Sequence, residues 1–397
     1  MLLEIIIFIA LGILAGTFTG LAPGIHINLV GAILVALSAS ILFFIPPIYL
    51  VIFIASMSIT HTFVDFIPSI FLGCPNDETG LSVLPGHELL KEGKGHSAIL
   101  FTAYGGLAAV ILVTIIAFPL IFFIKKIYPL ISSSIPYILI GISLIMILSE
   151  KKKFSSLIVY ALTGILGIIT LNLESLKEPL LPLLTGLFGS ASLIISIKSK
   201  TIIPPQTLET EKISIKKPLI SSLFASTLCG FLPGLGSAQA ATLGNTISKS
   251  DRKEFLALLG ATNVLVMSFS FLSLYAISKT RTGSAVVIKE IMGNPSLEIL
   301  ILILGTILIS GVASFYITKT LSILFSKNIH KINYSKLSIA TIVLLMLIVF
   351  IVSSWLGVIV FIISTFTGIY CINSNVKRTN MMACLLLPTI LLYLKVI

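Results

Sequence analysis

The chain has 397 residues and a net charge of +11; it is 56% hydrophobic and only 10% charged, with a mean hydropathy of +1.13. This composition predicts a multi-pass protein of the cell membrane and leaves no polar stretch long enough for a soluble catalytic domain. The basic residues lie in short loops between apolar segments, which is the positive-inside pattern rather than a nucleic-acid-binding surface. The four scattered cysteines form no CxxC pair and imply no disulfide or metal framework.

The apolar segments have the length of membrane-spanning helices. They predict an all-α polytopic membrane protein with about 10 to 13 hydrophobic helical segments. The first segment carries Glu4 but no Lys or Arg, so we interpret it as mature structure and not as a signal peptide. In chain order the segments cover residues 2–22, 27–45, 48–72, 97–124, 127–149, 155–173, 180–197, 218–243, 254–278, 297–320, 335–352, 354–371 and 381–396.

A Gly-x-x-Pro-Gly motif occurs twice, at Gly20–Gly24 and at Gly230–Gly234. Proline removes a backbone donor, so each motif should break its helix at membrane depth, where free backbone groups survive only in a protein-lined or wet cavity. Paired breaks in corresponding halves indicate a transporter binding site. The repeat predicts two transmembrane units, residues 1–197 and 218–397, joined by a cytoplasmic linker at 198–217.

The basic clusters predict the orientation of each break. The strongest clusters, expected in the cytoplasm, lie at 151–153, 198–217, 249–253, 327–336 and 377–378. Segment 218–243 has such charge on both sides, so it should be a re-entrant hairpin. Counting back from Lys151 makes the first hairpin open to the opposite face, which predicts two inverted repeats. The assignment of Lys125 and Lys126 to the outer face goes against the charge rule.

The residues that follow the two breaks are candidates for substrate binding. A helix that begins after each break would point free N–H groups and a positive dipole end at the cavity, which suits a carboxylate or phosphate. The alternative is close helix packing by glycine and alanine. Asn263 and Ser268 on the following helix are further polar candidates. The predicted substrate-binding residues at the breaks are Pro23, Gly24, His26, Asn28, Pro233, Gly234, Ser237 and Gln239.

Ionisable residues in the first half are candidates for ion coupling. His61 and Asp65 are four residues apart and share one helix face, and charged groups at membrane depth usually serve a function. The alternative is a pair that only locks two helices together. Asp77 and Glu78 lie in the polar loop Gly73–His96 and could coordinate Na⁺ or a substrate. That loop could equally be a solvated connection with an amphipathic helix near 84–92.

The second half has a counterpart of this loop, in which basic residues replace acidic ones. Thr282-Gly283 aligns with Thr79-Gly80, and Lys279 and Arg281 precede it. These two cations are predicted to receive an anionic group of the substrate, unless they face solvent at the membrane surface.

At these residues the chain resembles the large membrane subunit of the tripartite tricarboxylate transporters, the TctA-like family. The doubled Gly-x-x-Pro-Gly signature carries the resemblance, together with Gly73–Pro75, Pro85-Gly86 and Gly93-Lys94-Gly95. The resemblance implies a secondary carrier for di- or tricarboxylates, coupled to Na⁺ or H⁺. It also implies two partners, a small membrane subunit and an extracytoplasmic binding protein. The chain departs from the family in being short and in its polar stretch Asn76–Thr79.

The sequence therefore predicts a secondary active transporter of a small organic anion, with no cofactor beyond the coupling ion. A carrier of polyprenyl phosphate is the alternative, in which Lys279 and Arg281 would hold the head group. An intramembrane enzyme that uses His61 and Asp65 is disfavoured, because the helices carry no HExxH motif and no nucleophile elbow. A purely structural subunit is a further alternative.

Overall fold

The computed structural model describes residues 2–22, 45–73, 78–198, 203–209, 211–231, 236–331 and 333–396, and these ranges contain helices and no β-strand. Eight helices of this part are long and apolar enough to cross a membrane, which confirms the predicted all-α polytopic fold. In chain order the elements are α1 (Leu2–Leu21), α4 (Pro47–Val64), the π-helical turn η1 (Pro68–Leu72), η2 (Gly80–Ser82), α5 (Val83–Lys91), α6 (Gly95–Ile131), η3 (Ser132–Ser134), α7 (Ile135–Leu148), α8 (Lys153–Leu171), α9 (Leu180–Leu184), the π-helical η4 (Thr185–Ser190), α10 (Ala191–Lys198), α11 (Lys216–Phe231), α12 (Ser237–Ser248), α13 (Arg252–Ile277), α14 (Gly283–Met292), α15 (Leu297–Ile329), α16 (Tyr334–Asn373), η5 (Arg378–Met382) and α17 (Ala383–Tyr393).

Most helix boundaries follow the predicted apolar segments. Helices α8 and α13 begin and end within about two residues of the prediction. Helix α16 is interrupted at Ser354, where φ is 61° and ψ is −166°, and this is the first residue of the predicted segment 354–371 that follows 335–352. The predicted helix near 84–92 is present as α5. Segment 27–45 lies outside the described residues, apart from Ile45.

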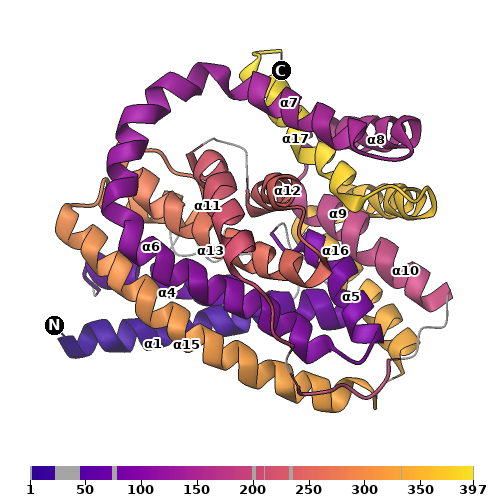
Figure 1. Cartoon of the computed structure of the whole chain (residues 1–397), viewed down its shortest axis with the longest axis horizontal. Coiled ribbons are helices and arrows are strands. Elements are labelled where there is room, and N and C mark those ends of the chain that lie inside the picture. Colours follow the sequence, from indigo (N-terminus) through magenta and orange to yellow (C-terminus); the bar gives the residue numbers. More distant parts are fainter. Residues whose placement is uncertain are drawn as a thin grey trace.

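The predicted turn between segments 97–124 and 127–149 is wrong in its position. Helix α6 continues through Lys125 and Lys126 to Ile131, and the turn is η3. Lysine is a good helix former, so two lysines alone do not end a helix. Pro119 and Pro129 lie inside α6 and bend it instead. Figure 1 shows the resulting arch of α6, which leads from one group of helices to the other.

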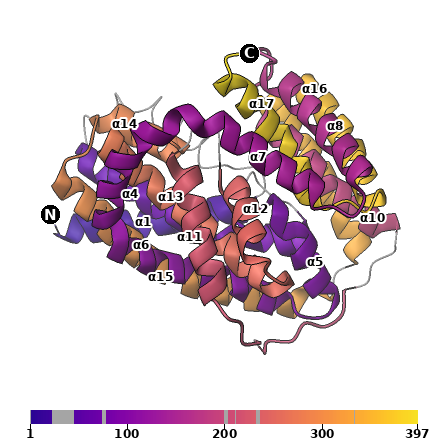
Figure 2. The same ribbon diagram turned by 45° about the horizontal axis from the view of Figure 1, so that its top comes forward.

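The first group of helices, which we call the first bundle, contains α1, α4, α6, α11, α13 and α15 (Figure 2). Helix α1 packs along α4 in the same direction, since Gly12, Gly16 and Gly20 face successive turns of α4. A methyl group at Gly16 would lie 2.4 Å from the Met57 carbonyl oxygen, so this approach requires glycine. The chain leaves α1 beside Asp65, well inside the apolar span Pro47–Leu72.

Helices that correspond in the two halves run in opposite directions. The α6 residues His96, Tyr104 and Val110 contact α15 at Ser322, Phe315 and Gly311 in turn, so the numbers rise in one helix as they fall in the other. The two helices are neighbours in the first bundle (Figure 1). This antiparallel arrangement is the one that an inverted repeat requires. The division into units at 198–217 stays a prediction, because each half contributes helices to both bundles.

The second Gly-x-x-Pro-Gly motif connects two short antiparallel helices, α11 and α12. Gly244, near the end of α12, lies against the carbonyl of Ser221, near the start of α11. At the other end of the pair, Cys229 of α11 and Gln239 of α12 line one small apolar cavity. Helix α12 has 12 residues and is about 18 Å long, which is too short to cross a membrane. The pair therefore has the shape of the predicted hairpin.

The second bundle contains α7, α8, α9 to α10, α16 and α17, and lies apart from the first in Figure 2. The two arms of α16 form a hairpin in this bundle. Ser353, next to the break, lies by the Glu178 carbonyl, while Ser374, beyond the second arm, receives a bond from Lys152. Tyr334, at the start of the first arm, reaches His87 of α5. Both arms therefore join the same end of the molecule.

The basic clusters predicted to be cytoplasmic gather at this end. Five sets of contacts tie them to one another and to α5, namely Lys152 with Ser374, Lys253 with Glu211, Arg252 with Glu88 and Glu92, Tyr334 with His87, and Arg378 with Ser192. We call this the basic end. Lys125 lies at the opposite end, 5.2 Å from the ring of Tyr275, near the C-terminus of α13.

Candidate functional site

Helix α4 carries the buried ionisable pair that the sequence singled out. The His61 and Asp65 side chains are 2% and 3% exposed, and His61 Nε2 lies 4.0 Å from Asp65 Oδ2. Serine and threonine side chains occupy the neighbouring turns, so the polar face of α4 is nearly continuous. Ser58 shares a hydrogen bond with Ser284 of α14, and Thr60 accepts one from Ser314 of α15.

The end of α1 brings the first motif to this pair. His61 Nδ1 lies 3.0 Å from the hydroxyl of Thr19, directly before the motif. A methyl group at Gly20 would lie 3.2 Å from the backbone nitrogen of Asp65. The motif and the ionisable pair, which are far apart in the sequence, therefore form one site. The predicted substrate-binding residues Pro23, Gly24, His26 and Asn28 follow the motif and lie outside the described residues.

Helix α13 of the second half completes this cluster with an amide. Asn263 Nδ2 donates to Asp65 Oδ2 at 3.4 Å and to the Thr62 carbonyl at 3.3 Å. Asn263 is 1% exposed, and its Oδ1 has no partner among the described residues. A buried carbonyl oxygen without a donor is costly, so it is available to a donor or cation that enters the site. Ser268, the other polar candidate on α13, is also buried and unpaired.

The start of α12 presents two more buried polar atoms. Gln239 Oε1 accepts a hydrogen bond from Gly236 N at 2.9 Å and so caps the helix, while its Nε2 has no partner among the described residues. Ser237 is 2% exposed and its hydroxyl is also unpaired. Together with the positive end of the helix dipole, these donors suit an anion. Pro233 and Gly234 of the same motif lie outside the described residues.

The Thr-Gly correspondence between the halves is visible in the hydrogen bonds. Ser69, near the end of the span Pro47–Leu72, donates a hydrogen bond to Thr79 at 2.5 Å. In the second half, Thr282 donates to Ser270 at 2.9 Å. In each half, a hydrogen bond between two hydroxyl groups therefore links the Thr-Gly turn to the preceding helix. Glu78 is half-buried next to Thr79, whereas Asp77 lies outside the described residues.

The two predicted anion-binding cations lie elsewhere. Lys279 is exposed, and Arg281 sits over the ring of Tyr128 with 5.8 Å between its guanidinium carbon and the ring centroid. Desolvation lowers the pKa of Arg281, and Tyr128 opposes that effect. Both residues follow the C-terminal end of α13, whereas Asn263, which contacts Asp65, lies near the middle of this helix. They line the end of the molecule opposite to the basic end.

Comparison with known proteins identifies the family. The sequence pattern of the tripartite tricarboxylate transporter TctA family matches residues 6–383, nearly the whole chain. The chain belongs to this family. It is similar to an uncharacterised protein of Methanocaldococcus jannaschii, with 33% identity over 404 residues that cover 98% of this chain and 99% of that protein. No solved structure matches the chain.

Membership makes this TctA-family chain a multi-pass membrane component of a tripartite tricarboxylate transport system, which involves further subunits. The resemblance seen in the Gly-x-x-Pro-Gly motifs is thereby confirmed. Thr19 is the contact residue that the sequence reasoning missed. Its only signal was its place one residue before the first motif, since nothing in a sequence shows which hydroxyl a histidine on another helix will reach.

Proposed function

We propose that the chain is the permease of a secondary transporter that moves a di- or tricarboxylate together with Na⁺ or H⁺. The observation that carries this proposal is the cluster of His61, Asp65 and Asn263, which is buried, joins the two halves and touches the first motif. A carboxylate at membrane depth is costly unless it binds a proton or a cation. Binding of the coupling ion there would change the contacts between the halves.

Substrate binding is assigned to the breaks between the half-helices. The unpaired donors of Ser237 and Gln239 support an anion site at the start of α12, as described above. The first motif would supply the opposing wall through Pro23, Gly24, His26 and Asn28. In this proposal a carboxylate of the substrate accepts hydrogen bonds from Ser237 and Gln239 after the second motif. His61 and Asp65, next to the first motif, bind the coupling ion. A small membrane subunit and an extracytoplasmic binding protein would deliver the substrate.

The test is uptake of labelled citrate into proteoliposomes of the purified chain, with an imposed Na⁺ or H⁺ gradient. Gradient-dependent uptake supports the proposal and names the ion. Absence of uptake by folded protein, both alone and with its partner subunits added, contradicts it.

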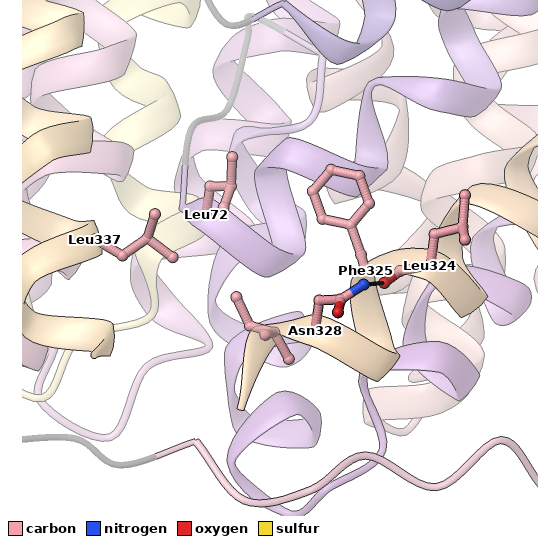
Figure 3. A pocket seen from close by; sticks show the side chains of 6 residues that line it. Leu72, Leu324, Phe325, Asn328 and Leu337 are labelled. Atoms are coloured by element: carbon pink, nitrogen blue, oxygen red, sulfur yellow. Dashed lines mark hydrogen bonds between the residues drawn. The ribbon is translucent and has the colours of Figure 1, made fainter. Parts of the chain in front are cut away.

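A second candidate cargo is a polyprenyl phosphate, and one observation favours it. A groove of about 270 Å³ opens on the surface between α15 and the start of α16, with five apolar side chains and Asn328 along it. Figure 3 shows Leu337 on one side and Phe325 on the other, with Leu72 between them. Such a groove suits an isoprenoid chain. Competition of citrate uptake by a soluble prenyl phosphate distinguishes the two cargoes.

A further inference from the structure

Arg378 differs from Arg252 and Lys253 at the basic end because no carboxylate of the described residues pairs with it. Arg252 lies 3.3 Å from Glu88 and 2.7 Å from Glu92. Arg378, the first residue of η5, donates from Nη1 to the hydroxyl of Ser192 at 2.7 Å. Within the part of the chain that the structure describes, no acidic oxygen lies within 4 Å of the Arg378 guanidinium.

The charge of Arg378 is compensated only in part, because the carboxylate that attracts it, that of Glu88, already pairs with Arg252. Burial, followed by the charges of Arg378 and Lys91, lowers the pKa of His87 to about 3, so this buried imidazole is neutral at physiological pH. Its Nε2 lies 3.4 Å from the hydroxyl of Tyr334. Burial lowers the pKa of Arg378 to about 10, and the guanidinium therefore stays protonated. A cation in such a place requires an anion or water.

Two further features make this position favourable for an anion. Arg378 begins the helical stretch that continues into α17, so its charge adds to the positive end of that helix dipole. A guanidinium has five N–H donors in a planar fork that matches a carboxylate, and Ser192 occupies only one side of it. Arg378 is partly exposed, which leaves the remaining donors within reach of a solute.

Arg378 and Ser192 also lie next to the polar loop Gly73–His96, which follows the span Pro47–Leu72. Ser192 belongs to α10, and the next residue, Leu193, packs on Gly73, where the loop begins. Phe188, one turn earlier, packs on Gly80, the first residue of η2. Arg378 and Ser192 therefore lie between the second bundle and α5, at the basic end, on the border of both bundles.

We propose that Arg378 and Ser192 form a second anion site, which binds a carboxylate of the transported solute at the basic end. This inference rests on the proposed function in that the solute is a polycarboxylate. The site is separate from the hairpin site, and it would hold the solute where it enters or leaves. The guanidinium would make a bidentate, charge-assisted contact, with the serine hydroxyl fixing the orientation of the fork.

The test is calorimetric titration of the purified full chain with citrate, comparing Arg378→Gln with Lys377→Gln. Lys377 is the matched control, because it is the neighbouring cation, is exposed, and forms its hydrogen bonds with Glu150 and Asn380 through its backbone nitrogen and carbonyl oxygen. We expect R378Q to weaken citrate binding about 10-fold or more, and K377Q to change it less than about twofold. Arg378→Lys, which keeps the charge and loses the fork, should fall between them.

Equal affinities for R378Q and K377Q would overturn the site, and so would an R378K protein that binds as tightly as the wild type. If R378Q does not fold, the R378K comparison alone decides. A wild-type chain that binds no citrate while its fold is intact would overturn this inference, whereas the proposed function fails only if citrate uptake with the partner subunits fails as well. Loss of binding in R378Q together with retained citrate uptake at saturating substrate identifies an accessory site.

Discussion

The two spans that meet at the candidate site, Pro47–Leu72 and Arg252–Ile277, have the same length and are almost fully buried, yet their chemistry differs. The first contains His61 and Asp65. The second contains no acidic, basic or histidine side chain after Glu254, and contributes the neutral Asn263 to the cluster. The two halves therefore share a common frame, by which we mean the length and burial of these two spans. The charge that could couple transport to an ion belongs to one half only. Substitutions in each half can test that asymmetry.

The largest effect is expected when the carboxylate is moved to the other half. D65N should lower gradient-driven uptake at least about 100-fold, because the site loses its only carboxylate among the described residues. The double variant D65N/N263D restores a carboxylate within the same cluster and should recover uptake to within about 10-fold of the wild type. Proteoliposome uptake measures both. A double variant as inactive as D65N would show that the position of the charge, and not its presence, is decisive.

The common frame can be tested through the crossing of α6 and α13. A methyl group at Gly260 would lie 1.9 Å from the carbonyl oxygen of Thr102, so Gly260→Ala forces the helices apart and should cost about 1–3 kcal/mol or more. Gly305→Ala is the control, since within the described residues no side chain and no other helix lies within 4 Å of the position of its added methyl group, its immediate chain neighbours aside. Thermal unfolding in detergent should show a lowered Tm for the first variant only. Equal Tm values would contradict the close crossing.

The neutral chemistry of the second half should appear in substrate affinity. Ser237→Ala removes an unpaired buried hydroxyl at the start of α12 and should raise the KM for citrate about 3- to 10-fold with little change in stability. Ser248→Ala, at the other end of the same helix, is the matched control and should leave KM unchanged. A change of the same size in both variants would indicate a general effect on the helix.

The smallest effect concerns the linker that joins the halves. Hydrogen bonds from Lys253 and Lys94 lower the pKa of Glu211 to about 2, below its usual value of 4.5. A carboxyl with a lowered pKa stabilises the folded state above its usual value, and this contribution is lost as the pH falls from 4.5 towards 2. We expect pepsin to cut the linker progressively faster across this range. When each rate is divided by the rate at which pepsin cuts an unfolded substrate at the same pH, the pH dependence should vanish in E211Q, whereas K212Q, which changes an exposed neighbour, should retain it.

The sequence was sufficient for those features that depend on neighbours along the chain. Hydrophobic length located the spans, the repeated Gly-x-x-Pro-Gly motif located the hairpin of α11 and α12, and four-residue spacing placed His61 beside Asp65. The contact of Asn263 with Asp65 could not be predicted, because it depends on how α13 crosses α4. In the sequence, Arg378 and Lys377 both look like cations of a loop. Only the side chain of Arg378 is hydrogen-bonded to another helix, through Ser192 of α10, and the sequence does not show this.

The most direct test of the central claim compares two transport modes of the D65N protein in proteoliposomes. If the cluster of His61, Asp65 and Asn263 couples transport to an ion, D65N loses citrate uptake driven by a Na⁺ or H⁺ gradient but keeps exchange of internal for external citrate without a gradient. This result would separate coupling from substrate binding. Gradient-driven uptake at the wild-type rate would contradict the account, because the buried carboxylate would then have no part in coupling.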